Sequence, residues 1–175
     1  KTAKVDKNAY IGPDAKVYGN ATVCGTAHIS DRALVYQNAV VFGSVMIFSD
    51  AHVYENAQVC GDARVFGTAQ VCGNAVVSSN AHVYDKARVF DNARVFGNAH
   101  VFDNAWVYGN AWVSGDAEVC GDAMVYGDAM VFGNAEVFDN ARVNGEDKVF
   151  GNKSVQKETK KDRIFINGKW YEEVE

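Results

Sequence analysis

The chain has little of what interrupts a regular structure or marks a common binding site. It holds one proline, Pro13, in 175 residues. No apolar run approaches the ~20 residues that a membrane-spanning helix needs, so we expect no membrane partner. The net charge is −5 and the basic residues do not cluster, which argues against a nucleic-acid partner.

The four cysteines lack the spacing of a metal site. None belongs to a CxxC pair or a Cys/His zinc pattern, so we predict no metal site and no cofactor. All four stand directly after a valine, where tyrosine or phenylalanine usually stands, and we interpret them as small apolar substitutes: Cys24, Cys60, Cys72 and Cys120. Unpaired thiols are typical of a reducing compartment, and we therefore expect a cytoplasmic protein.

A six-residue repeat takes up most of the chain. Valine or isoleucine returns at every sixth position from Val5 to Val155. Alanine stands two residues earlier from Ala3 to Ala141, with Val45 as the one exception. Six is not the helical period, which excludes an α-helical repeat. Residues two apart lie on the same side of an extended strand, so we expect an interior made of alanine and valine.

A turn follows each short strand. Pairs such as Gly19-Asn20, Gly61-Asp62 and Asp91-Asn92 adopt positive φ and form tight turns at low cost. A strand of about four residues and a tight turn, repeated every six residues, predict a flat-sided coil. Three such sides close a triangular prism whose interior is narrow enough for alanine and valine to fill.

The pattern V-x-G-N-A-x-V resembles the hexapeptide repeat of left-handed parallel β-helix proteins, many of which are bacterial transferases. The resemblance covers Ala3 to about Val155. It implies an all-β, three-sided, left-handed parallel β-helix with 18 residues per coil and about eight to nine coils, roughly 40 Å long. The chain departs from the family by placing Tyr, Phe or Cys directly after the aliphatic residue and glycine one place later.

Near the C-terminus charged residues replace alanine in the repeat. Charged Asp147 and Lys153 take inward positions, so we expect the prism to end near them. We predict a β-helix over residues 1–155, a polar linker over 156–162 and a hairpin over 163–175 with an Asn167-Gly168 turn. An isolated hairpin is marginal in water, so this one should cap the last coil or tether a neighbouring subunit.

Residues 18 apart should stack in columns along the rod. An uninterrupted asparagine column runs from Asn20 to Asn110, and its side chains can hydrogen-bond between coils. Aromatic columns include Tyr36, Phe66 and Phe102, whose rings must point outward because alanine and valine fill the inside. These rings either form structural ladders or make an apolar contact surface. A homo-oligomer, with a trimer favoured, would bury such a surface.

Two outward columns have the composition of a protein interface, in which Trp and Met stand beside Arg. The predicted interface residues are Arg88, Trp106 and Met124 on one face, and Arg94, Trp112 and Met130 on the adjoining face. A solvated stripe with two incidental tryptophans is the alternative.

The resemblance also implies chemistry to test, because the family is known for acyl transfer with a histidine as general base. His82 and His100 fall in one column with Glu118 above them, and a histidine beside a carboxylate suits a base and its orienting group. The alternative is a variable surface position. No histidine spacing matches the zinc enzymes of the family.

These observations lead to three alternative hypotheses for the function. The first is a non-catalytic rod that self-associates or presents a flat face to a protein partner, favoured because no insertion interrupts the repeats to supply catalytic loops. The second is an acyltransferase-like enzyme that uses acyl-CoA, with a surface histidine as general base. The third is an acidic mimic of nucleic acid built on Asp85, Asp103 and Asp139, which the neighbouring arginines disfavour.

Overall fold

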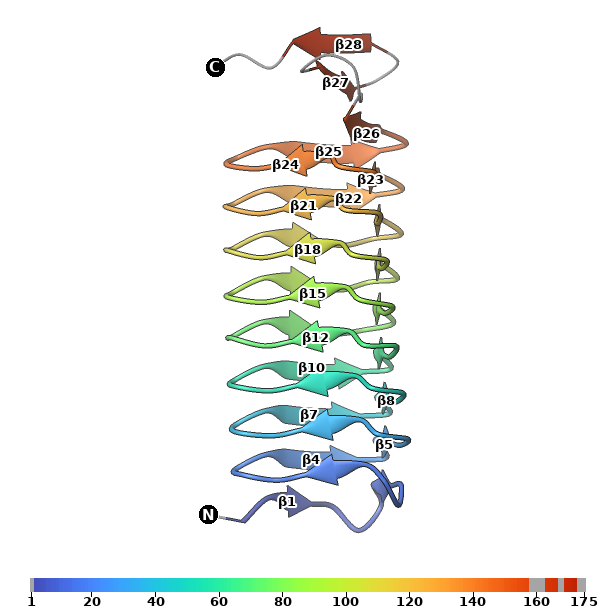
Figure 1. Ribbon diagram of the computed structural model, residues 1–175, viewed down its shortest axis with the longest axis vertical. Coiled ribbons are helices and arrows are strands. Elements are labelled where there is room, and N and C mark those ends of the chain that lie inside the picture. Colours follow the sequence, from blue (N-terminus) through green and yellow to red (C-terminus); the bar gives the residue numbers. More distant parts are fainter. Residues whose placement is uncertain (1, 158–162, 167–168, 173–175) are drawn as a thin grey trace.

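The computed structural model describes residues 2–157, 163–166 and 169–172 of the chain. These residues form a rod of stacked coils, and every strand belongs to one of three sheets (Figure 1). The described residues contain no helix, and so none that could cross a membrane. The predicted all-β, three-sided β-solenoid is confirmed, and the strands at the front of Figure 1 run leftward as the chain rises, which is a left-handed course.

Each side of the prism is one sheet, in which neighbouring strands come from successive coils. Sheet A contains β1 (Lys4–Val5), β4 (Thr22–Gly25), β7 (Val40–Gly43), β10 (Gln58–Gly61), β13 (Val76–Val77), β16 (Arg94–Val95), β19 (Trp112–Val113), β22 (Met130–Gly133) and β25 (Lys148–Gly151). Sheet B contains β2 (Tyr10–Ile11), β5 (His28–Ile29), β8 (Met46–Ile47), β11 (Arg64–Val65), β14 (His82–Val83), β17 (His100–Val101), β20 (Glu118–Val119), β23 (Glu136–Phe138), β26 (Ser154–Lys157), β27 (Arg163–Ile166) and β28 (Lys169–Glu172). Sheet C contains β3 (Lys16–Val17), β6 (Leu34–Val35), β9 (His52–Val53), β12 (Gln70–Val71), β15 (Arg88–Val89), β18 (Trp106–Val107), β21 (Met124–Val125) and β24 (Arg142–Val143).

The coils stack in one register along the rod. Parallel pairing places His82 beside His100 and Val83 beside Val101, a separation of 18 residues. The predicted columns therefore exist, and each coil bonds to its neighbours through the backbone.

The interior is built from alanine and valine, as predicted. Every inward position from Ala21 to Val137 is fully buried, with isoleucine only at Ile29 and Ile47. No polar or charged residue is buried among the described residues. The hydrophobic effect therefore acts evenly at every level of the rod, because each coil buries the same small side chains.

The corners combine left-handed turns with lines of amide hydrogen bonds. Asp91 has a φ of 58°, and its carboxylate accepts a 3.2 Å bond from the Gly109 backbone N–H one coil later. The predicted asparagine ladder is present, because each side-chain amide from Asn20 to Asn92 donates to the asparagine 18 residues later at 2.9–3.2 Å.

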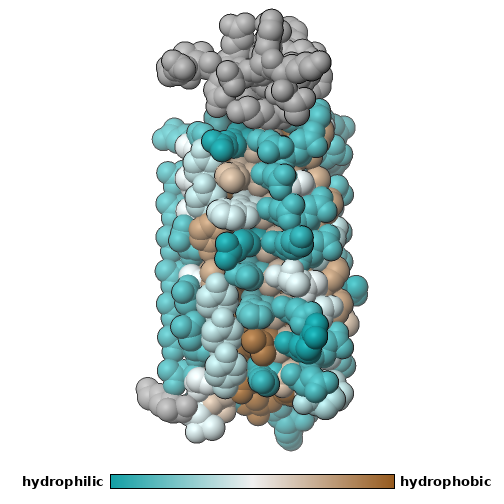
Figure 2. Space-filling model, viewed as in Figure 1, coloured by the Kyte–Doolittle hydropathy of each residue, from teal (hydrophilic) through white to brown (hydrophobic). Residues whose placement is uncertain are grey.

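Aromatic rings stack outside the core, as predicted. Tyr36 and Tyr54 stack at 5.1 Å between ring centroids, and Phe48 and Phe66 at 4.8 Å, with planes 4° apart in both pairs. Of the two interpretations of these rings, the structural ladder describes most of them. Most ladder rings are half-buried because each ring covers the next, and the face in Figure 2 is largely hydrophilic with scattered apolar spots.

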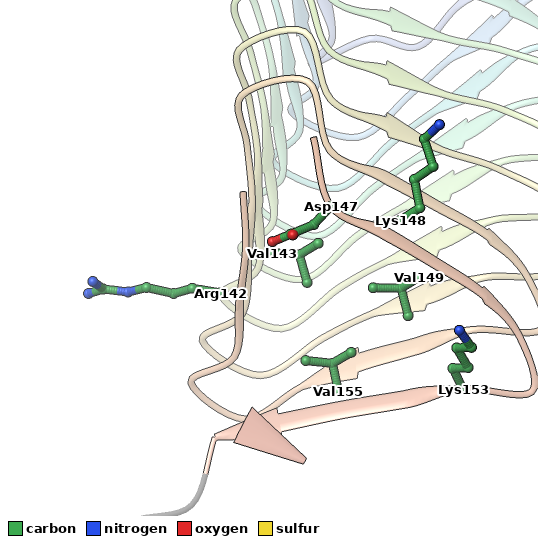
Figure 3. A pocket seen from close by; sticks show the side chains of 7 residues that line it. All are labelled: Arg142, Val143, Asp147, Lys148, Val149, Lys153 and Val155. Carbon is green, nitrogen blue, oxygen red and sulfur yellow. The ribbon is translucent and has the colours of Figure 1, made fainter. Parts of the chain in front are cut away.

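The interior is less protected at the two ends. In the first coil Val5 is 43% exposed. In the last coil a cavity of about 170 Å³ lies against Val143, Val149 and Val155, and Figure 3 shows that Asp147 and Lys153 line it at the inward positions. Asp147 is exposed and Lys153 half-buried, so both charges reach solvent and the closed core stops here.

Two antiparallel strands extend sheet B beyond the last coil. Strand β26 reaches Lys157, two residues into the segment expected to be the linker, and pairs with β27, which pairs with β28 (Figure 1). The predicted Asn167-Gly168 turn and the hairpin side chains lie outside the described residues. The role of the hairpin as a cap or tether stays a prediction.

Candidate interaction surface

The predicted interface residues form two matching columns on adjoining faces. Pairing places Arg88 beside Trp106 and Trp106 beside Met124 in sheet C. Sheet A repeats the arrangement with Arg94, Trp112 and Met130. The arginine Cζ lies 5.3 Å from the indole centroid in both columns, a cation–π contact in each case.

The two tryptophans differ in what surrounds them. Beside Trp106 an unbroken ladder runs through Phe90, Tyr108 and Tyr126, and Phe90 presents its ring at 6.0 Å. Trp106 is half-buried as a result. The arginine of this column is also engaged, because Arg88 donates a 3.0 Å hydrogen bond to Gln70 Oε1. This face is closed by its own side chains.

The ladder beside Trp112 is interrupted. Phe96 meets Trp112 edge-on at 6.0 Å, but serine replaces the aromatic ring at Ser78 and Ser114 on either side of Phe96. Trp112 is 39% exposed and Arg94 is exposed. An open groove of about 470 Å³ results, and we call it the Trp112 groove; it is lined by Gln58, Val76, Ser78, Arg94, Phe96 and Trp112.

A second hollow lies on sheet B at a similar interruption. Cys120 stands where its column has Phe102 and Phe138 one coil away on either side. A groove of about 250 Å³ opens there, and we call it the Cys120 groove; it is lined by Asp103, Glu118, Cys120, Gly121, Glu136, Phe138 and Asp139. Burial, and then the carboxylate of Asp103, raises the pKa of the Cys120 thiol to about 11. This thiol is therefore protonated at neutral pH and a poor nucleophile.

The histidine column contains the predicted neighbours but lacks the contact expected of a catalytic pair. The His82 and His100 rings lie 4.7 Å apart, and Tyr84 meets His100 edge-on at 6.1 Å. Glu118 pairs with His100 in the sheet, yet no hydrogen bond joins them in the described part of the chain. Burial lowers the pKa of His82, and His100 adds to the effect. The general-base role stays a prediction.

The described residues hold no group of three or more His, Cys, Asp or Glu side chains arranged to bind a metal ion. The four cysteines form no disulfide with one another.

Neither groove was predicted from the sequence. The available signal was the loss of an aromatic residue from a column, at Ser78 and Ser114 on one face and at Cys120 on another. A small residue between large ones leaves a hollow because the backbone spacing between coils is constant.

One family comparison agrees with the fold. Residues 57–68, 69–85 and 87–103 match a family described as the YdcK beta-solenoid repeat, so the middle of the rod is similar to that repeat. No match was found among curated proteins or among solved structures.

Proposed function

We propose that the protein is a non-catalytic rod that associates with copies of itself through the Trp112 face of sheet A. We also propose that the chain is a divergent relative of the hexapeptide-repeat proteins, which its repeat and three-sided coil resemble. A homo-oligomer, with a trimer favoured, is the expected assembly.

The exposure of Trp112 carries this proposal. An indole that is 39% exposed beside an open groove leaves apolar surface in water, and contact with a partner would remove it. Tryptophan and arginine are the residues most enriched among those that dominate binding energy at interfaces. Trp112 and Arg94 supply both in one groove.

The regularity of the coil favours an assembly role over catalysis. Binding and catalytic groups usually stand on connecting segments held by a rigid scaffold. From Lys4 to Lys157 the turns between strands stay short, and the flat sheet faces carry the Trp112 and Cys120 grooves. Such faces suit contact with another flat face.

The test compares two tryptophans that differ mainly in exposure. Trp112→Ala and Trp106→Ala remove the same side chain from consecutive strands, and each removes a cation–π contact of the same length. Sedimentation velocity over a hundredfold range of concentration should show an oligomer for the wild type and for Trp106→Ala. Trp112→Ala should be shifted towards the monomer. A wild type that stays monomeric at the highest concentration refutes self-association, and equal behaviour of the two variants refutes the assignment to this face.

A further inference from the structure

The two grooves carry opposite charge. Arg94 is the one charged residue that lines the Trp112 groove. The Cys120 groove is lined by four carboxylates and no cation: Asp103, Glu118, Glu136 and Asp139. Among the described residues the only ion pair joins Arg32 to Asp50, so Arg94 has no described carboxylate partner within its own chain.

The grooves also lie at matching heights along the rod. Strand β16, which carries Arg94, and strand β17, which Asp103 follows, are consecutive strands of one coil. One coil later, β19 carries Trp112 and β20 leads to Cys120. In a ring of parallel rods related by an axis along the rod, residues in contact have the same height. Arg94 would then meet Asp103, and Trp112 would meet the hollow at Cys120.

We infer that the Trp112 groove of one copy packs against the Cys120 groove of the next copy, in a head-to-tail contact between parallel rods. The inference rests on the proposed self-association and gives it a geometry. The Trp112 indole enters the hollow that Cys120 leaves, and Arg94 faces the carboxylates of Asp103 and Glu118. A contact between two different surfaces repeats from copy to copy around an axis, in contrast to a two-fold dimer, and it closes into a ring when the rotation completes a full turn.

Charge favours this contact over one between two identical faces. The outward column of sheet A contains Lys4, Arg94 and Lys148 and no carboxylate. That of sheet B contains Glu118 and Glu136 at the height of the Cys120 groove, and its one cation, Arg64, lies three coils before Glu118. Two parallel A faces related by a two-fold axis along the rod would oppose Arg94 with Arg94. Like charges at an interface disfavour that partner, and opposite charges steer the correct one.

Charge reversal tests the contact from both sides. Arg94→Glu and Glu118→Arg should each weaken self-association by at least about tenfold, because each opposes like charges across the contact. Arg142→Glu is the matched control, since Arg142 is an exposed outward residue of sheet C. That variant should associate as the wild type does. Circular dichroism melts of all three variants check that the fold is retained.

Mixing the two reversed variants decides the geometry. The Arg94→Glu chain keeps an intact Cys120 groove, and the Glu118→Arg chain keeps an intact Trp112 groove. In an equimolar mixture these two intact grooves can pair, so a mixed dimer that neither variant forms alone should appear. Absence of this mixed dimer refutes the head-to-tail contact.

The remaining outcomes separate this inference from the proposed function. If the wild type is oligomeric and Arg94→Glu and Glu118→Arg associate equally well, the groove-to-groove contact is wrong while self-association stands. A monomeric wild type removes both. Sodium chloride at about 0.5 M should weaken wild-type association, because salt screens charges at a partly exposed contact.

Discussion

The Asn110 side-chain amide donates a 2.9 Å hydrogen bond to the Asp128 carboxylate, and this bond ends the ladder that begins at Asn20. Every amide in the line donates towards the C-terminal end and accepts from the N-terminal side. A carboxylate accepts but cannot donate. Aspartate therefore fits the last position of the ladder and no earlier one.

We predict that Asn74→Asp lowers stability more than Asp128→Asn does. The new carboxylate would still accept from Asn56, but it would face the Asn92 oxygen with no proton to donate. The expected loss is about 1 kcal/mol, because the ladder is solvent-exposed. Thermal melts at pH 7 measure it, and an Asn74→Asp chain as stable as the wild type would contradict the directional ladder.

Two adjacent valines of β13 point in opposite directions, one into the rod and one away from it. Val77 is fully buried, and Val76 is half-buried on the outer face of β13. Val77→Ala should cost roughly 2 kcal/mol through lost transfer energy and a cavity, and Val76→Ala should cost well under half of that. Urea unfolding of both variants measures the difference. Equal losses would mean that packing is not confined to the interior.

Gly43 and Gly151 both have a positive φ, but they differ in the space that an added Cβ would find. Their φ values are 100° and 72°, and a Cβ at Gly43 would lie 2.6 Å from the Gly61 carbonyl oxygen, whereas one at Gly151 meets nothing within 4 Å. Gly151→Ala should lose the roughly 1–2 kcal/mol that a left-handed conformation costs. Gly43→Ala should lose more, because the next coil must also move. Melting temperatures in the opposite order would refute this prediction.

Alkaline pH should destabilise the rod. The folded state holds the Cys120 thiol proton up to a pKa of about 11, whereas an unfolded thiol releases it near pH ~8.5. The folded state thus binds more protons between these values, so this contribution is complete below pH ~8.5 and is lost as pH rises towards 11. Burial raises the pKa of Tyr54 and Tyr84 as well, and adds to the same trend.

A Cys120→Ser variant isolates the thiol. Urea midpoints from pH 8 to pH 11 should fall less steeply for the variant than for the wild type, because serine does not titrate in this range. Parallel curves for the two proteins would show that the thiol has an ordinary pKa.

The C-terminal hairpin should protect the edge of sheet B. Strand β26 pairs with β27, so a chain that ends at Lys157 exposes an unpaired strand edge. We expect a lower melting temperature and concentration-dependent aggregation, measured by light scattering. A chain that ends at Glu172 is the control, and identical behaviour of the two chains would leave the hairpin without a capping role.

The sequence predicts the interior well because one geometric condition governs it. Ala75 and Val77 are one copy of the repeated alanine–valine pair. Residues two apart on a strand point to the same side of the sheet, and both side chains are fully buried. The exposure of the two tryptophans could not be predicted in this way. Trp106 and Trp112 each make a cation–π contact of the same length with their own arginine. Their exposure differs because Tyr108 fills the corner beside Trp106, whereas the smaller Ser114 stands beside Trp112. Such coverage depends on three-dimensional packing between coils, which a one-dimensional period does not contain.

Each coil of the shaft encloses the same cross-section, so one coil of 18 residues could be deleted and its two neighbours would still stack on each other. Excision of one such coil would shorten the molecule by a single step and leave a continuous shaft. The same excision below Trp112 would bring this tryptophan nearer to the first coil without altering its surroundings further along. The number of coils therefore sets the length of the shaft, and the 18-residue register sets the height of each surface site along it.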